Sequence, residues 1–210
     1  GGSVDLTVEE DRANAVFCDW YPDARGGKAV ADLLFGKRSP SGKLPLTFYH
    51  DEDLAHLPEF TDYSMQGRTY RYLSRTPLYP FGYGLTYGDV RVLAASVEKT
   101  PDGGLSVRAN VQNMGKVATE DVVQVYVRAE QSPHATPNPI LCGFARVSLA
   151  AGAFAEVTFF VAPASLSVVD DAGNRLFPGG KYTLYVGTSQ PDTRSRALAG
   201  ASPVKVELQL

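Results

Sequence analysis

The sequence is poor in the residues that build covalent cross-links and metal centres. Its 210 residues include only two cysteines, Cys18 and Cys142, and three histidines, His50, His56 and His134. Two cysteines so far apart provide no disulfide framework, and no metal-ligand spacing is present. We therefore expect both thiols to be buried and reduced, and the histidines to have surface or hydrogen-bonding roles.

Strong net charge and long apolar stretches are also missing. The 20 basic and 23 acidic residues give a net charge of −3, which argues against nucleic acid or an anionic membrane as partner, because both attract clustered Lys and Arg. No apolar run approaches the roughly 18 residues that would span a bilayer. No secretion signal is visible, but the chain starts at Gly1. We therefore expect any leader to lie upstream, which leaves cytoplasmic and secreted locations open.

What the chain does contain is an unusual aromatic stretch, residues 77–87 (PLYPFGYGLTY). Its alternation of rings with proline and glycine fits neither a helix nor a strand. Pro80 lacks a backbone donor, while Gly82 and Gly84 permit positive φ or close backbone approach. Because a free linker would be polar, we expect a rigid, packed joint between two domains. Its rings should be partly exposed if a further domain normally covers them.

Residues 1–50 have an α/β character. Residues 15–18 (AVFC) are typical of a buried parallel strand. A helical pattern around Val30 and Leu33 ends at Phe35–Gly36, a good C-cap. Residues 44–48 predict a short final strand, at an edge because of Pro45. One strand, one helix and one edge strand cannot cover both faces of a parallel sheet. We therefore expect residues 1–50 to be the C-terminal part of a larger α/β sandwich domain.

Residues 51–89 form a connecting segment that ends in the joint. A connection of this length inside a compact protein is usually functional or disordered. Tyrosines, arginines and a methionine gather at residues 63–72 (YSMQGRTYRY), a composition that argues against disorder.

Residues 90–210 predict an all-β domain. Period-two alternation marks strands around residues 105–111, 123–127, 157–161, 183–186 and 204–210, separated by Gly- and Asn-rich turns. About seven short strands in about 120 residues is the pattern of an immunoglobulin or fibronectin type III-like sandwich.

Several carboxylates could in principle form a small active site. Asp51, Glu52 and Asp53 are better interpreted as a solvated charge run or a helix cap. Asp19, beside Trp20, could also be an acid near a sugar platform. Residues 170–174 (DDAGN) form a hairpin turn rather than a calcium loop, because the spaced oxygen ligands and terminal Glu are missing.

The motifs together resemble glycoside hydrolase family 3, in its bacterial β-xylosidase and β-glucosidase form. The resemblance rests on residues 20–22 (WYP), 26–27 (GG), 31–36 (ADLLFG), 40–48 (PSGKLPLTF), 67–72 (GRTYRY) and the joint at 77–87. Downstream, residues 113–116 (NMGK), 121–127 (DVVQVYV), 141–147 (LCGFARV) and 178–180 (PGG) resemble the family's fibronectin type III-like domain.

The resemblance implies a retaining, exo-acting β-glycosidase that needs no metal or organic cofactor. Its two carboxylates would stand about 5 Å apart, and both would lie upstream of this chain, on a barrel and the first part of the sandwich domain. The chain alone is then expected to be inactive and to contain no catalytic residue. The partners implied are an oligosaccharide substrate and the missing N-terminal portion, in cis or as a separate chain. At residues 23–25 (DAR) the sequence departs from the family's usual Gly-Gln-Glu, so the resemblance implies no polar role for that turn. The resemblance also implies that Asp19 follows a buried strand and that Trp20 packs between a helix and the sheet, which favours structural roles for both.

Sugar sites combine aromatic faces with groups that bind hydroxyls, and residues 63–72 offer both. We hypothesise that Arg68 and Tyr70, together with Met65, contact the leaving-group sugar at the rim of the active site. The alternative is that Arg68 and Arg71 form inter-domain ion pairs while the tyrosines pack into the joint.

Two other classes remain open for the chain as a whole. A carbohydrate-binding module would need outward aromatics on the sandwich, for which Tyr126 and Tyr185 are the main candidates. A structural module would instead stabilise or dimerise a partner polypeptide. The partner could also be a second copy of the same protein, which would give a homo-oligomer.

Overall fold

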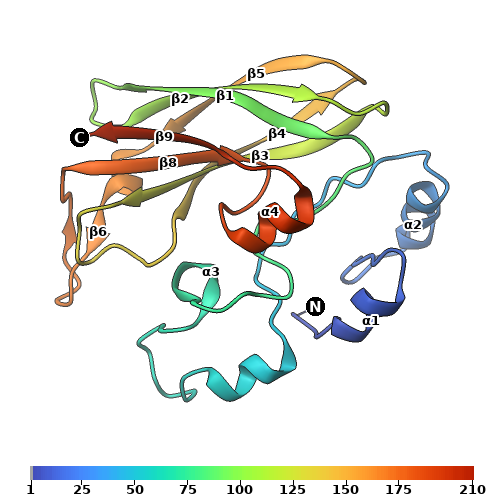
Figure 1. The fold of residues 1–210 in the computed structure, drawn as a ribbon, viewed down its shortest axis with the longest axis horizontal. Coiled ribbons are helices and arrows are strands. Elements are labelled where there is room, and N and C mark those ends of the chain that lie inside the picture. Colours follow the sequence, from blue (N-terminus) through green and yellow to red (C-terminus); the bar gives the residue numbers. More distant parts are fainter. Residues whose placement is uncertain (1) are drawn as a thin grey trace.

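The computed structural model describes residues 2–210, in which a β-rich part follows a part with little regular structure (Figure 1). The helical elements are α1 (Thr7–Arg12), α2 (Gly26–Leu34), the 3-10 helix η1 (Asp51–His56), α3 (Thr69–Tyr72), the 3-10 helix η2 (Pro163–Leu166) and α4 (Thr193–Ala199). The strands are β1 (Val90–Lys99), β2 (Leu105–Asn113), β3 (Thr119–Ala129), β4 (Ile140–Leu149), β5 (Phe154–Val161), β6 (Val168–Val169), β7 (Arg175–Leu176), β8 (Lys181–Gly187) and β9 (Val204–Gln209).

Two antiparallel sheets form a sandwich. One has the strand order β1-β2-β5 and the other β4-β3-β8-β9, while β6 and β7 form a separate hairpin. Figure 1 shows the two sheets stacked, with α4 on the side that faces the N-terminal part. The expected class is confirmed: an immunoglobulin-like sandwich follows a fragment with α/β sequence character.

The core lies between the sheets because alternate residues of each strand point inward. Leu105, Val107 and Val111 of β2 are fully buried, as are Val125 of β3 and Leu184 of β8. Burying side chains of this size contributes about 1.5–3 kcal/mol each.

Helix α2 forms where its apolar spacing predicts it. Phe35 is its C-cap and Gly36 has the left-handed φ of 66° that a glycine adopts readily. None of the helix residues is buried, and Leu34 and Phe35 are 71% and 80% exposed. The C-terminal end of α2 therefore presents apolar surface to solvent.

The buried strand expected at residues 15–18 is wrong for this chain. These residues have no strand assignment, Val16 and Phe17 are exposed, and so is Cys18, whose burial was also expected. A strand exists only where a neighbour completes its hydrogen bonds, and within residues 2–210 no strand pairs with this segment. Trp20 likewise is 37% exposed and contacts Phe48 edge-on, rather than lying between a helix and a sheet.

Residues 44–48 also differ from the prediction. They join no sheet, and only Phe48 makes an isolated antiparallel bridge, to Tyr79 of the joint. Pro45 cannot donate to a ladder, which limits pairing here.

The second thiol agrees better with expectation. Cys142 is half-buried, its Sγ donates to the carbonyl of Val125 at 3.3 Å, and burial raises its pKa to about 12. It is therefore protonated and unreactive at neutral pH.

One of the two aromatics expected to face outward on the sandwich is corrected. Tyr126 is fully buried, whereas Tyr185 is partly exposed. Other aromatics are more exposed: Phe144, Phe154 and Phe160 are 70%, 68% and 57% exposed. Phe144 lies on β4, in a different sheet from the other two, and Phe154 and Phe160 stand at opposite ends of β5. Six residues of strand separate them by about 20 Å, so they do not form a flat sugar-binding platform.

Candidate functional site at the joint

The joint obtains its hydrogen bonds from the segment at residues 44–48. The N–H of Phe48 donates to the carbonyl of Tyr79 at 2.9 Å, and the N–H of Leu44 donates to the carbonyl of Tyr83 at 2.9 Å. In return, the N–H of Gly82 donates to the carbonyl of Leu44 at 2.8 Å. The two segments therefore satisfy each other's backbone groups, which explains how a stretch with such punctuation becomes rigid.

The rings of this region form two chains of aromatic contacts. Tyr70 of α3 stacks on Phe81 of the joint, with ring centroids 4.2 Å apart, and meets Tyr126 of β3 edge-on at 6.2 Å. The second chain consists of Trp20, Phe48, Tyr79 and Tyr83, with successive centroids 6.1, 6.2 and 5.8 Å apart. Each such pair contributes about 0.5–1.5 kcal/mol beyond area burial. The first chain links the joint directly to the sandwich.

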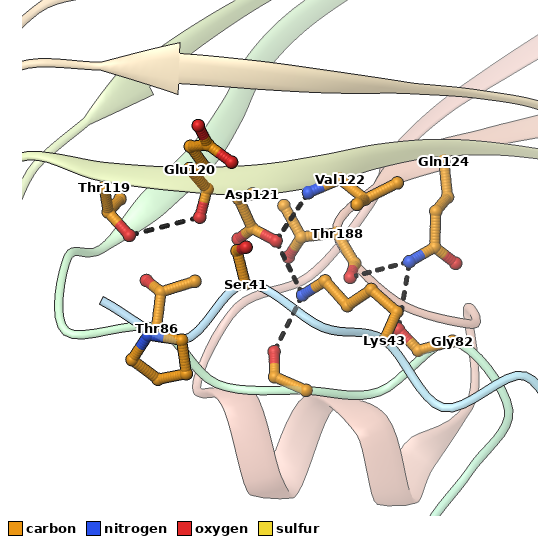
Figure 2. Close-up of polar contacts among 12 residues, drawn as sticks. Ser41, Lys43, Gly82, Thr86, Thr119, Glu120, Asp121, Val122, Gln124 and Thr188 are labelled. Atoms are coloured by element: carbon orange, nitrogen blue, oxygen red, sulfur yellow. Dashed lines mark hydrogen bonds and ion pairs between the residues drawn. The ribbon is translucent and has the colours of Figure 1, made fainter. Parts of the chain in front are cut away.

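A buried ion pair also connects the two parts of the chain (Figure 2). The Lys43 ammonium lies 2.7 Å from Oδ1 of Asp121, at the start of β3, and donates to the carbonyl of Gly84 at 2.7 Å. The side chains of Lys43 and Asp121 are only 10% and 6% exposed. Burial raises the pKa of Asp121, while Lys43 and the N–H of Val122 oppose that rise. The pair is a fixed, desolvated contact between the segment before the joint and the sandwich.

Gln124 forms a second polar bridge, also visible in Figure 2. Its Nε2 donates to the carbonyls of Gly82 at 2.9 Å and Thr188 at 3.0 Å, and its Oε1 accepts from the hydroxyl of Tyr126 at 2.6 Å. Gly82 has a φ of 76°, and a Cβ there would collide with the Gln124 amide. The backbone of the joint at Gly82 thus lies in direct contact with a side chain of the sandwich, and only glycine leaves room for this approach.

Neither Lys43, Asp121 nor Gln124 was singled out from the sequence. The available signal was a carboxylate and an amide within the apolar run 121–127, since a buried strand tolerates such groups only when they have partners. The sequence does not reveal where those partners are.

The structure places the three predicted substrate-contact residues in different surroundings. Arg68 turns back on its own loop, where Nη2 donates to the carbonyls of Pro58 at 2.9 Å and Glu59 at 2.7 Å. Tyr70 is 8% exposed, and its hydroxyl accepts from the N–H of Leu141 at 3.1 Å. Met65 is 38% exposed. Across the part of the chain that is described, neither Arg68 nor Arg71 reaches a carboxylate at ion-pair distance.

Met65 and Tyr70 nevertheless border the same hollow, of about 560 Å³, while Arg68 does not. The hollow is lined by residues of four segments: Ser3, Pro45, Leu46, Thr47, Tyr49, Met65, Thr69, Tyr70, Arg71, Tyr72 and Phe81. It lies where residues 45–49, the segment around α3, and the joint meet. Its volume falls within the range of small-molecule sites.

Two of the other carboxylates considered, Asp53 and Asp170, have structural roles, whereas Asp19, Asp51 and Glu52 are exposed. Asp53 is buried in η1, where it accepts from the backbone N–H of His50 at 3.1 Å and from Arg75 at 2.9 Å. Asp170 accepts three hydrogen bonds from residues 172–174 within the β6–β7 turn. No cluster of three or more metal-binding side chains occurs within residues 2–210. The helices in that range are also too short or too polar to cross a membrane.

The fold and the joint define a class of modular protein, in which a segment of α/β type is rigidly joined to an immunoglobulin-like sandwich. Residues 1–87 match the glycosyl hydrolase family 3 C-terminal domain, and residues 121–190 match the fibronectin type III-like domain. The chain belongs to glycoside hydrolase family 3, of which it carries the C-terminal portion.

Similar proteins are considerably longer. The chain is 41% identical over 195 residues to a xylan 1,4-β-xylosidase of Xylanibacter ruminicola, with 91% of this chain and 22% of that protein aligned. It is 30% identical to a periplasmic β-glucosidase of Salmonella typhimurium, with 89% and 25% aligned. A solved structure of a family 3 exo-β-xylosidase bound to a xylobiose aziridine probe superposes with a TM-score of 0.81 at 28% identity, over 100% of this chain and 29% of that one. The chain thus spans about a quarter of the length of these relatives.

Proposed function

We propose that this chain is the C-terminal part of a retaining, exo-acting β-glycosidase that removes terminal β-linked xylose or glucose from oligosaccharides. The observation that carries the proposal is the match of both parts of the chain to family 3, together with relatives named β-xylosidase and β-glucosidase. Retention requires two carboxylates about 5 Å apart, which we assign to the upstream portion of the enzyme.

The contribution of this chain is then scaffolding. Residues 1–50 complete the α/β sandwich domain, residues 51–89 connect and form the joint, and residues 90–210 form the fibronectin type III-like domain. The start of β1 at Val90 supports the second boundary. The exposed apolar residues Val16, Phe17, Leu34 and Phe35 support a covering partner, the upstream portion, in cis or as a separate chain.

A finer proposal concerns the substrate. Met65, Arg68 and Tyr70 would lie at the rim of the active site and contact the leaving-group sugar. Met65 supports this directly because it is exposed at the hollow. Tyr70 would act as a wall of the hollow, and Arg68 would contact the sugar while its Nη2 also braces residues 58–68 through two carbonyl contacts.

The test is kinetic analysis of the full-length enzyme with aryl β-xyloside and aryl β-glucoside, with NMR detection of the first-formed anomer. We expect hydrolysis of at least one glycoside with retention of configuration. Inversion, or hydrolysis of neither glycoside, would overturn the proposed activity.

A further inference from the structure

We infer that Asn138, in the loop between β3 and β4, is a positioning residue through which the sandwich fixes α3 and the wall of the hollow that α3 forms. The inference rests on the proposed function for the reaction that this wall serves. Across the described residues, Asn138 itself does not line the hollow. Its influence on a substrate therefore passes through α3.

Helix α3 cannot hold its own position. It has only four residues, and the N–H of Leu73 closes its last turn on the carbonyl of Thr69 at 3.0 Å. Isolated helices shorter than about 12 residues are marginal in water. The carbonyls at a helix C-terminus also have no partners inside the helix. Both the existence and the place of α3 therefore depend on groups outside it.

Asn138 supplies the partners that α3 lacks. Its Nδ2 donates to the carbonyls of Tyr70 and Leu73, each at 2.8 Å. Its backbone N–H donates to the carbonyl of Arg71 at 3.1 Å. These three hydrogen bonds form the Asn138 clamp. A single residue of the sandwich, 68 positions along the chain from Tyr70, thus satisfies most of the C-terminal end of α3.

The clamp is stiff on the side of the sandwich. Asn138 stands between Pro137 and Pro139. Each proline ring fixes its own φ, and a residue that precedes proline is restricted to extended conformations. The carbonyl of Asn138 also accepts from the hydroxyl of Thr136 at 2.7 Å. The loop therefore presents the Asn138 amide in one defined place.

The chain that leads into α3 needs such a restraint. Met65 and Thr69 have φ values of 58° and 54°, in the left-handed region that non-glycine residues rarely adopt. Such conformations persist only where the surrounding structure enforces them. The N–H of Thr69 donates to the hydroxyl of Tyr49 at 2.8 Å and holds the start of α3, while Asn138 holds its end. Without the clamp, we expect α3 to shift as the strain relaxes.

Such a shift would act on binding rather than on the chemical step. All four residues of α3, Thr69–Tyr72, line the hollow, whereas the catalytic carboxylates are assigned to the upstream portion. Loss of the clamp should therefore weaken binding on the leaving-group side and leave bond cleavage largely intact. A purely structural role would instead lower the fraction of active enzyme, which reduces the apparent kcat and leaves KM unchanged.

Kinetics of the full-length enzyme test this distinction. Asn138→Asp keeps the shape of the side chain but removes its N–H donors, and Asn110→Asp makes the same change at an exposed position on β2. With xylobiose or cellobiose, whichever is hydrolysed, we expect Asn138→Asp to raise KM about tenfold more than KM for the matching aryl glycoside, because two hydrogen bonds are lost. Asn110→Asp should leave this ratio of KM values unchanged. An unchanged ratio in Asn138→Asp, with or without a lower apparent kcat, would overturn the inference.

Hydrogen exchange of the full-length enzyme gives a second readout that needs no turnover. Asn138→Asp and Asn138→Ala should both speed deuterium uptake in residues 65–73 about tenfold, because local opening becomes easier, and should leave uptake in β2 unchanged. Unaltered uptake in residues 65–73, or equally faster uptake throughout the sandwich, would overturn the positioning role. If the wild-type enzyme hydrolyses neither glycoside, the proposed function fails while hydrogen exchange still decides the role of Asn138. Normal hydrolysis with unaltered uptake would reject the inference alone.

Discussion

Lys43 and Asp121 form a 2.7 Å ion pair that is almost sealed from solvent and connects the segment before the joint to β3 of the four-stranded sheet. A buried ion pair adds little net stability, but removing one partner leaves an uncompensated buried charge. We therefore regard this pair as the contact that fixes how the two parts of the chain dock.

Removing one charge of the Lys43–Asp121 pair should destabilise the fold strongly. Lys43→Met should lower the free energy of unfolding by about 3–5 kcal/mol, measured by urea denaturation. The matched control is the exposed pair of Arg108 and Glu98, whose side chains are 46% and 64% exposed. Glu98→Gln should cost less than about 1 kcal/mol. Equal losses in the two variants would contradict the docking role of the buried pair.

Gly84 should be irreplaceable for a steric reason. A Cβ at this position would collide with the carbonyl oxygen of Gly42, so Gly84→Ala should cost about 1–3 kcal/mol through overpacking. Gly27, inside α2, has no atom within 4 Å of the place that a Cβ would take, and Gly27→Ala should be neutral or stabilise by up to about 1 kcal/mol. Thermal unfolding of the two variants checks this, and a neutral Gly84→Ala would refute the close approach.

The loss of folding stability at low pH should depend in part on Glu207. Hydrogen bonds from Lys181 and Lys205 lower its pKa from 4.5 to about 2. A carboxyl with a lowered folded-state pKa stabilises the fold above the unfolded value, and that contribution is lost as the pH falls from about 4.5 to 2. Glu207→Gln should therefore flatten the pH dependence of stability in this window. Glu156→Gln, at an exposed position on β5, should not change it, and indistinguishable profiles for the two variants would count against the assignment.

Kinetics can distinguish a substrate contact by Arg68 from a purely structural role in holding its own loop. In the full-length enzyme, Arg68→Ala should raise KM for disaccharide substrates more than for aryl glycosides, while Arg108→Ala on the sandwich should change neither. Lowered stability with unchanged kinetics would show that Arg68 only holds the carbonyls of Pro58 and Glu59.

The sandwich was predictable because its signals are local. Leu105, Val107 and Val111 alternate with polar residues, and the pattern alone decides which face is buried. Strand β1 was harder to delimit, since its register shifts between Val92 and Ala94 and its alternation is interrupted there. The C-cap at Phe35–Gly36 is also local, and it was predicted correctly.

The joint was predictable as a packed unit but not in its contacts. Rings and glycines between residues 77 and 87 require partners, yet nothing in that stretch identifies Tyr126 or Gln124, which come from a strand far along the chain. The strand expected at residues 15–18 failed for the same reason, because strand formation depends on a neighbour rather than on the run itself. Lys43 and Asp121 each look ordinary until the fold brings them together.

The most direct test of the account measures hydrolysis of aryl β-xyloside and aryl β-glucoside by this chain alone and by the chain joined to the upstream portion. We predict no turnover by the isolated chain and clear turnover of at least one glycoside by the complete enzyme. Turnover by the isolated chain would contradict the assignment of the catalytic carboxylates to the upstream portion.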